Sequence, residues 1–483
     1  MQKVKLLIAM ALVSLSATAL EVESTAGSLS SLVTDPDATS LTITGTMDAR
    51  DFYYIANNMS QLKSLDISGV DILAYTSEDE LFGSDNEYSA KSIPTMAFFG
   101  SSLSSVSFPD DLQAIGSYAF AGCEDLTAVT LPESLASIGS YAFNGTGLST
   151  VEVPASASLG EGVFSSCEAL ESAVVNSEVL GEKMFANDTN LSQVTLGAGV
   201  TEIGSEAFSG CASLAGITLE GDGITTIGNE AFMSSGLESL EWNSLDQLTT
   251  VGDWAFANSQ LQDASLPESV ESIGEGAFFY DTNLSSFNRP AEVTTIPAYS
   301  LAGLPNLSLS KEDLDLTDVT EIGDYAFYNV TARSYRVEFP STLSSIGERA
   351  FAGTTHVENY SSKATTVPAL GENVWEGVDQ PAVELAIDNP SVANEYRAAD
   401  QWKEFRIVSY PTSVERLTGG EVRVFAGHGL ITIEAPDNAV AQVVMVNGAN
   451  RTFTVKAGRT DVSVAPGIYL VRVDRQNFKV LVR

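Results

Sequence analysis

Ile115-Gly116-Ser117-Tyr118-Ala119-Phe120 recurs 23 residues later as an identical string that ends at Phe143. Close variants of this I-G-x-x-A-F pattern continue along the chain and end at Phe208, Phe232, Phe256, Phe278, Phe327 and Phe351. Weaker copies end at Phe98, Phe164, Phe185 and Leu301, and Trp375 fills the same position in a divergent last copy. Successive copies are 21 to 26 residues apart, so the chain contains about a dozen repeats of one structural unit.

A second signature, L-x-x-V-x-L-P, lies between the copies. One example is Leu126, Val129, Leu131 and Pro132. The V-x-L alternation predicts a short strand whose apolar residues face inward, and the proline ends it because proline cannot donate to a ladder. The glycine of I-G is then expected to turn the chain, and Ala-Phe to return to the core. Each repeat is therefore predicted to form one coil of a solenoid.

These repeats resemble the BspA-like leucine-rich repeats of bacterial surface proteins, whose units read L-x-x-I-x-L-P-x-x-L-x-x-I-G-x-x-A-F-x-x-C. The resemblance covers residues 90–380 and implies a leucine-rich-repeat solenoid, a β-dominated α/β repeat of about a dozen coils. Residues 20–89 and 381–409 look like its two caps. The first coil would be closed by Phe52, Leu62, Leu65 and Ile67, and the last by Tyr396, Trp402 and Phe405.

The N-terminus has the features of an export signal. Lys3 and Lys5 precede the apolar stretch Leu6 to Leu15, and Ala17-Thr18-Ala19 is a small-residue cleavage site. Residues 1–19 are therefore predicted to be a signal peptide. No later stretch approaches the roughly 18 apolar residues of a spanning helix. We expect an exported protein without a transmembrane segment, either extracellular or on the outer-membrane surface.

The repeat pattern stops before residues 410–483, where short apolar runs alternate with turns. Six or seven strands in this segment predict a small all-β sandwich. Its ending, P-G-I-Y-L-V-R-V from Pro466 and K-V-L-V-R from Lys479, resembles the C-terminal sorting domain of type IX secretion in the Bacteroidetes. The alternative is an Ig-like module that packs against the end of the solenoid.

The net charge of −39 is unevenly distributed. Residues 410–483 contain nine Lys/Arg and six Asp/Glu, a balance of +3, so residues 1–409 carry 15 bases and 57 acids, a balance of −42. An acidic body repels phosphate backbones, which argues against nucleic acid as a partner. The charge is consistent with a basic partner or simply with a long, soluble surface.

The three cysteines, Cys123, Cys167 and Cys211, each follow a repeat phenylalanine by three residues and are 44 residues apart. That spacing places them in one column, on every second coil, about 10 Å from each other. Because a disulfide needs Cα atoms within about 7 Å, we predict three free, buried thiols, with no disulfide and no metal site.

No catalytic motif stands out. The two histidines, His356 and His428, lie in no metal spacing and beside no nucleophile motif. The acids at Glu78, Asp79, Glu80, Asp85 and Glu87 could attract Ca²⁺, but they lack the D-x-D-x-D-G spacing and favour a solvated loop. We expect no enzymatic activity and no cofactor, although an unmarked carboxylate pair or a hydrolase site on the caps remains an alternative.

A column of residues two positions before the repeat phenylalanine is the candidate ligand-binding surface. It contains Tyr118, Tyr141, Trp254, Tyr299 and Tyr325. Elsewhere it contains Lys183, Glu206, Glu230 and Arg349, so we expect it to face solvent. Exposed aromatics suit protein hot spots or sugar stacking, although they could also simply cover the turns.

The family resemblance implies recognition of host or bacterial proteins, including extracellular-matrix components and other bacteria. The predicted function is therefore adhesion by a secreted or cell-surface protein. The alternative is a carbohydrate- or mucin-binding protein that supports glycan capture, with the paired tyrosines as anchors. The fold alone does not decide between them.

Overall fold

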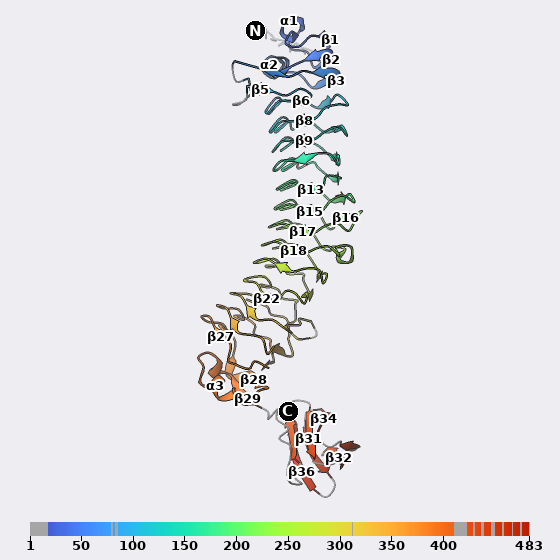
Figure 1. Cartoon of the computed structure of the whole chain (residues 1–483). Helices are drawn as coiled ribbons and strands as arrows, with labels where there is room; N and C mark the ends of the chain where they lie inside the picture. The colour runs from blue at the N-terminus through green and yellow to red at the C-terminus, as the bar shows by residue number, and fades with distance from the viewer. Residues whose placement is uncertain are drawn as a thin grey trace, which may run out of the picture. The chain divides into compact units, whose positions relative to one another are not determined.

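The structure is a computed structural model that describes residues 18–78, 81–82, 86–311, 313–409, 423–427, 430–435, 439–445, 450–455, 458–465, 467–473 and 476–482. The chain divides into two compact units, Met1–Leu385 with Tyr396–Arg406 and Ala386–Glu395 with Ile407–Arg483. The first unit is a stack of coils (Figure 1). The predicted signal peptide lies almost wholly outside the described residues, which begin at Thr18.

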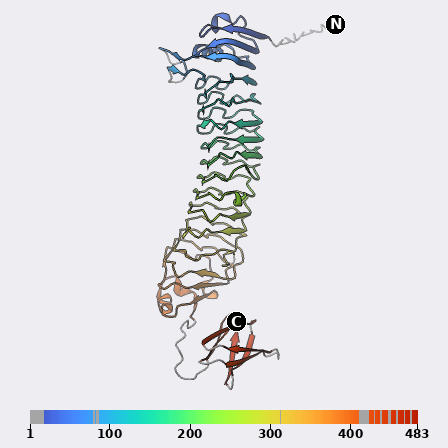
Figure 2. The same ribbon diagram turned by 45° about the vertical axis from the view of Figure 1, so that its right-hand side comes forward.

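Two ladders of short parallel strands run along the stack, and Figure 2 shows their strands lying one above another. The predicted V-x-L segments form β7 (Ser105–Ser107), β10 (Thr150–Val153), β12 (Ser172–Val175), β14 (Gln193–Leu196), β16 (Thr218–Leu219), β19 (Asp263–Ser265), β21 (Ser286–Asn288), β24 (Val337–Phe339) and β26 (Asn359–Ser362). Equivalent residues of successive coils are in register, as in the pairing of Val175 with Leu196. At Ala128 the expected strand is reduced to a single bridge with Ser105.

The second ladder lies where the sequence predicted only a turn. The residue before the repeat glycine belongs to a strand of two residues, and these strands are β6 (Ser92–Ile93), β8 (Ala114–Ile115), β9 (Ser137–Ile138), β11 (Ser158–Leu159), β13 (Val179–Leu180), β15 (Glu202–Ile203), β17 (Thr226–Ile227), β18 (Thr250–Val251), β20 (Ser272–Ile273), β22 (Thr295–Ile296), β23 (Glu321–Ile322), β25 (Ser345–Ile346) and β27 (Ala369–Leu370). The expectation was incomplete because the chain pairs with its neighbours before it turns.

The repeat glycine is required by the neighbouring coil. A Cβ atom at Gly139 would lie 2.4 Å from the backbone nitrogen of Ser117 in the preceding coil. The same distance separates a Cβ at Gly160 from the nitrogen of Ser140. Because the obstructing atoms are backbone, no side-chain rotation can relieve the clash, and only glycine allows the coils to approach this closely.

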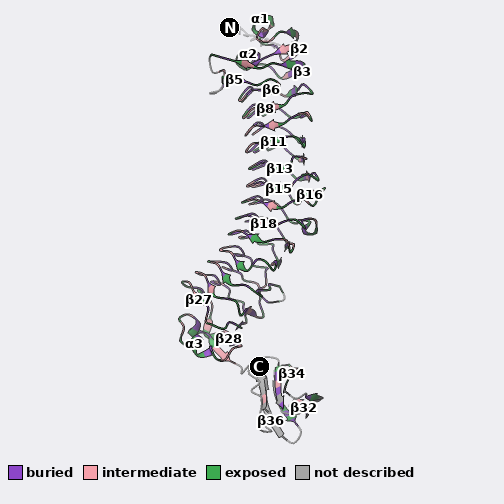
Figure 3. Ribbon diagram, viewed as in Figure 1, coloured by how far each residue is buried: buried purple, intermediate pink, exposed green. Residues whose placement is uncertain are grey.

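Buried segments, drawn in purple, recur along the stack of coils (Figure 3). The repeat phenylalanines are among the buried residues of the core. Nine of them stack ring on ring from Phe98 to Phe278, with neighbouring centroids 5.2 to 5.9 Å apart. Leu301 interrupts the stack, which resumes at Phe327 and Phe351 and ends on Trp375. An aromatic column, interrupted once at Leu301, therefore connects most of the coils.

The N-terminal end of the stack is built from longer strands. These are β1 (Ala19–Ser24), β2 (Ser40–Met47) and β3 (Ser64–Ile72), which pair in parallel and continue onto β7. The segment also contains α1 (Leu29–Leu32), α2 (Ala49–Asn58), β4 (Tyr75–Thr76) and β5 (Glu87–Tyr88). Asp48 and Asp51 form a capping box at the start of α2. Phe52 of this helix packs edge-on against Phe98, with ring centroids 6.1 Å apart, and so covers the first ring of the aromatic column.

The residues expected to close the last coil are buried there. Trp402 donates its indole N–H to the carbonyl oxygen of Pro368 at 3.1 Å, and Tyr396 shares a hydrogen bond with Ser362 at 2.7 Å. Phe405 packs edge-on against Trp375, with centroids 5.0 Å apart. Nearby elements are η2 (Gln380–Ala382), β28 (Glu384–Ile387), α3 (Ala393–Ala398), η3 (Trp402–Glu404) and β29 (Arg406–Ser409), and a further 3₁₀ turn, η1, covers Trp242–Ser244.

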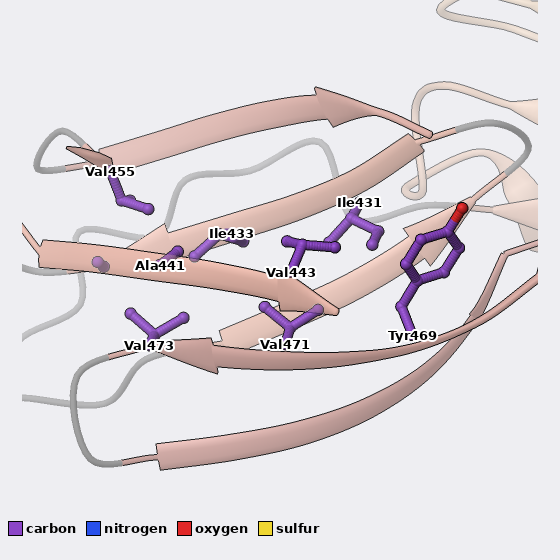
Figure 4. Close-up of a cluster of buried hydrophobic side chains, with 9 residues drawn as sticks. Ile431, Ile433, Ala441, Val443, Val455, Tyr469, Val471 and Val473 are labelled. Carbon is purple, nitrogen blue, oxygen red and sulfur yellow. The ribbon is translucent and has the colours of Figure 1, made fainter. Parts of the chain in front are cut away.

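The second unit contains two antiparallel sheets. One comprises β30 (Arg423–Gly427), β31 (Leu430–Ala435) and β34 (Gly458–Ser463), and the other comprises β32 (Ala439–Met445), β33 (Asn450–Val455), β35 (Gly467–Val473) and β36 (Gln476–Val482). Ile431 and Ile433 of the first sheet share a buried cluster with Val443 and Val471 of the second (Figure 4). The sequence pattern did not indicate β34, and the expected Asn447-Gly448 turn lies outside the described residues.

Candidate recognition surface

The column two residues before the repeat phenylalanine has an unusual backbone. Tyr118, Tyr141, Trp254, Tyr299 and Tyr325 have φ angles of 55° to 58°, in the left-handed region. Each donates its backbone N–H to a carbonyl of the next coil, as Tyr118 does to Ser140 at 3.0 Å. A left-handed conformation is unfavourable for residues with a Cβ, so these inter-coil bonds hold it in place. The column therefore presents its side chains from a fixed backbone.

The structure gathers the five predicted residues into two groups. Tyr118 and Tyr141 stack with centroids 5.2 Å apart, and Tyr299 and Tyr325 stack at 4.8 Å. Trp254 lies 6.0 Å from Tyr299 and is tilted against it. Five coil steps, or about 24 Å at one strand spacing each, separate Tyr141 from Trp254. The five side chains do not form one site.

The rings of Tyr141 and Trp254 are partly covered by the next coil. A Cβ at Gly162 would lie 2.4 Å from the ring of Tyr141, and one at Gly276 would lie 2.4 Å from the ring of Trp254. Each ring therefore rests on a glycine of the next coil, while the other face of Tyr141 packs on Tyr118. Tyr141 therefore offers solvent mainly its edge and its hydroxyl group, whereas Tyr118, at the start of the pair, is 39% exposed.

The hydroxyls of the column join a network of charges. Tyr141 donates its hydroxyl to Glu161 at 2.5 Å, and Lys183 donates to the same carboxylate at 2.8 Å. The bond to Glu161 raises the pKa of Tyr141 to about 12, and the bonds from Lys183 and Tyr141 lower the pKa of Glu161. At the second group, Arg349 donates to the hydroxyl of Tyr325 at 2.8 Å. The surface thus combines aromatic edges with fixed charges.

Sequence reasoning missed three aromatic residues that extend the second group. Phe279 packs edge-on against Trp254 at 5.1 Å and contacts Tyr280 at 4.6 Å, and Tyr328 packs against Tyr325 at 5.7 Å. Phe279 and Tyr328 directly follow a repeat phenylalanine, a position that contains alanine or serine in most coils. Their size at that position was a signal available in the sequence.

The cysteine column is buried, as predicted. Cys123, Cys167 and Cys211 lie within the coils, and each thiol donates to a backbone carbonyl at 3.1 to 3.2 Å. Burial raises the pKa of all three thiols, to about 12 for Cys167. These groups are therefore poor nucleophiles and behave as small core residues.

Two aspartates occupy the same column, which the sequence reasoning did not notice. Asp188 and Asp281 are fully buried. Asp188 accepts the backbone N–H of Cys167 at 2.7 Å, and Asp281 accepts the hydroxyl of Ser259 at 2.6 Å. The other carboxyl oxygen of each has no hydrogen-bond partner among the described residues. Burial raises the pKa of Asp281 to about 7 and that of Asp188 well above its usual range.

Within the described residues, no three His, Cys, Asp or Glu side chains lie close enough to hold a metal ion. His356 is exposed and shares a hydrogen bond with Thr355 at 3.2 Å. His428 and the acids Asp79, Glu80 and Asp85 lie outside the described residues. No helix in the described part of the chain is long and apolar enough to cross a membrane.

The repeat region matches the family model described as BspA type leucine rich repeat region, over residues 91–195, 178–308 and 306–381. Together these stretches cover more than half of the chain. The chain belongs to this family. The resemblance inferred from the I-G-x-x-A-F repeat is thereby confirmed for the solenoid of this BspA-type protein. A search of curated proteins found no match.

Solved structures of other leucine-rich-repeat proteins are similar to this BspA-type protein at low identity. A protein from Bacteroides ovatus is 18% identical over 81% of this chain and 92% of its own, with a TM-score of 0.47. A protein from T. pallidum is 27% identical over 35% of this chain and 69% of its own, with a TM-score of 0.27. The pneumococcal vaccine antigen PcpA is 14% identical over 76% and 80%, with a TM-score of 0.37. The assignment of this chain to the BspA-type family therefore rests on the match to the family model and not on these structures.

Proposed function

We propose that this protein is exported, is exposed on or released from the cell surface, and recognises other proteins through its solenoid rather than catalysing a reaction. The observation that carries the proposal is the column of aromatic edges, hydroxyls and charges held on a fixed backbone. Tyr, Trp and Arg dominate the energetics of protein interfaces, especially where they are already ordered. The signal peptide predicted at residues 1–19 and the family support a role outside the cell, in adhesion to host or bacterial proteins.

The covered ring faces favour proteins over glycans as ligands. A sugar ring packs against the face of an aromatic ring, whereas a protein can also pack on its edge and bond to its hydroxyl. Tyr141 lies between Tyr118 and Gly162, so neither of its faces is available for stacking. The coverage of Tyr141 therefore supports a protein ligand over the carbohydrate or mucin alternative, which would need an open ring face.

We also propose that residues 410–483 are a β-sandwich that acts as a sorting domain for type IX secretion. Support comes from the P-G-I-Y sequence at the start of β35, the basic segment from Lys479 and the apolar cluster shared by two sheets. Mass spectrometry of the native secreted protein tests this proposal, and we expect these residues to be absent from it. A secreted form that retains them would favour an Ig-like module.

A binding array tests the recognition proposal. The purified full-length protein would be screened at physiological salt against matrix proteins, bacterial surface proteins, mucins and glycans. We expect saturable binding to a protein, weakened at least about tenfold, or about 1.4 kcal/mol, by Tyr118→Ala with Tyr141→Ala or by Trp254→Ala with Tyr299→Ala and Tyr325→Ala. Tyr335→Ala is the matched control, because Tyr335 is 58% exposed but lies outside the column.

Other outcomes would overturn the proposal. Binding only to glycans, lost on the tyrosine changes, would establish the carbohydrate alternative instead. Protein binding that all the column variants retain would place the interface elsewhere. Turnover of chromogenic glycosides or peptides by the full-length protein would show that it is an enzyme.

A further inference from the structure

A cavity lies at the N-terminal end of the solenoid, apart from the second aromatic group. Its lining includes Ser101, which shares a hydrogen bond with the thiol of Cys123 at 3.2 Å, and Met96, which occupies the aromatic-column position of its coil. Its volume is about 730 Å³, and it opens between α2, residues 81–82 and the turn at residues 96–103. Small-molecule sites in proteins have volumes of about 300 to 1,000 Å³. The cavity is therefore large enough for one organic ligand of that class.

The walls of the cavity are held by specific contacts. Phe82 packs edge-on against Tyr53 of α2, with centroids 5.8 Å apart, and against Tyr88, at 6.1 Å. The hydroxyl of Tyr88 accepts the backbone N–H groups of Leu81 and Phe82, both at 3.1 Å. Phe98, the first ring of the aromatic column, is 2% exposed and also lines the cavity. These contacts hold the residues that line the cavity in place against the core of the solenoid.

The rim exposes large apolar side chains. Phe99 is 57% exposed, and Met96 and Tyr53 are each 41% exposed. Phe99 occupies the position after the repeat phenylalanine, where Phe279 and Tyr328 instead pack against neighbouring rings. The exposed area of the three rim side chains is roughly 300 Å², well below the approximately 800 Å² per partner of a stable protein interface. The rim suits a small ligand better than a second protein.

The described part of the lining contains no charged side chain. None of the seventeen described residues around the cavity is Asp, Glu, Lys, Arg or His, although the chain carries a net charge of −39. A charged ligand would lose its hydration there without gaining a counter-charge. Asn57, Ser60 and Ser102 supply neutral hydrogen-bonding groups. The exposed rim offers contact to a ring, whereas most of the accessible wall is polar. We propose that this cavity binds one uncharged small molecule that combines an aromatic or alicyclic ring with hydrogen-bonding groups.

This site goes beyond the proposed protein recognition and can be tested separately. Nile red, a neutral aromatic dye, would be titrated into the full-length protein while its fluorescence is followed. We expect one saturable site. Phe99→Asp should weaken binding at least about tenfold, because it places a charge at an apolar rim. Tyr335→Asp, which changes an equally exposed aromatic on a distant coil, should leave the affinity unchanged.

A second variant fills the cavity without removing an existing contact. Ala56→Trp adds a large side chain at an exposed position of α2 that lines the cavity, and it should abolish dye binding while the thermal unfolding midpoint stays unchanged. Absence of a saturable site in the unmodified protein, or equal affinity in all three variants, would refute the proposal. So would a concentration-dependent dimer that Phe99→Asp dissociates in sedimentation velocity, because the occupant would then be a second copy.

Discussion

Single positions of the repeat account for most of what the sequence could predict. The repeat phenylalanines, the glycines and the cysteine column were each visible as a residue type at a fixed spacing. Asp188 and Asp281 were not recognised, because aspartate is common in this chain and is normally a surface residue. Only their place three residues after the repeat phenylalanine distinguishes them from the other acids.

Asp281 should make stability depend on pH. Its pKa is about 7 in the fold and about 3.9 in an unfolded chain. Between these values the unfolded state releases the proton and the folded state retains it, so the contribution of Asp281 to stability falls as pH rises from about 4 to about 7. Asp281→Asn removes this dependence, and we expect the variant to gain up to roughly 4 kcal/mol relative to the parent across that window.

Urea unfolding of both proteins at pH 4 to 8 measures this difference. Asp222→Asn is the control, because Asp222 is exposed. A difference between parent and Asp281→Asn that stays constant over this pH range would show that Asp281 is ionised in the fold.

For the strands, the number of residues in each one determined whether the sequence could predict it. The V-x-L segments alternate over several residues, which is enough to indicate a strand and its inward face. The second ladder uses two residues per coil, too few for an alternation, and its strands exist only because the neighbouring coils supply partners. The column of five aromatics and the pairing of its tyrosines on adjacent coils were visible in the sequence, but the packing of Tyr141 and Trp254 against glycines one coil away was not.

The aromatic column should couple adjacent coils. Phe208 stacks on Phe185 at 5.6 Å and on Phe232 at 5.3 Å. We expect Phe208→Ala to cost about 3 to 5 kcal/mol and to weaken the coils on both sides, because the cavity removes contacts from each. Hydrogen exchange should show faster exchange of ladder amides in those coils, whereas Phe99→Ala, at an exposed position, should leave them unchanged. Faster exchange confined to the coil of Phe208 would contradict this coupling.

For the whole molecule, the uneven charge is the dominant electrostatic feature. Residues 1–409 have a balance of −42, and the coils place like charges in adjacent rows, such as Glu206 next to Glu230. Neighbouring coils are about 4.8 Å apart, so like charges in adjacent rows repel each other when salt is low. Lys183, whose ammonium lies 3.6 Å from the carboxylate of Glu206, offsets part of this repulsion. Composition alone predicts this self-repulsion, but only the register shows which acids are neighbours.

The unfolding temperature should therefore rise with salt. Between about 10 mM and 150 mM NaCl the screening length falls from about 30 Å to about 8 Å, which weakens repulsion along the solenoid. Calorimetry of the full-length protein measures the shift. The double variant Glu206→Gln with Glu230→Gln should show a smaller rise in unfolding temperature between the two salt concentrations. An unfolding temperature independent of salt would mean that the repulsion is already balanced within the fold.

The hydrogen bonds between coils also have a mechanical consequence. Bonds such as that from Phe120 N–H to the carbonyl of Ala142, at 2.8 Å, join each coil to the next, so tension applied between the solenoid ends is carried by every coil interface in series. A coil of 21 to 26 residues that detaches can extend to roughly 70 to 90 Å, compared with about 4.8 Å in the stack. Under load the solenoid would lengthen in steps of one coil and dissipate work in each. If such a protein is held at a cell surface in moving fluid, this stepwise extension would limit the force that reaches its attachment points.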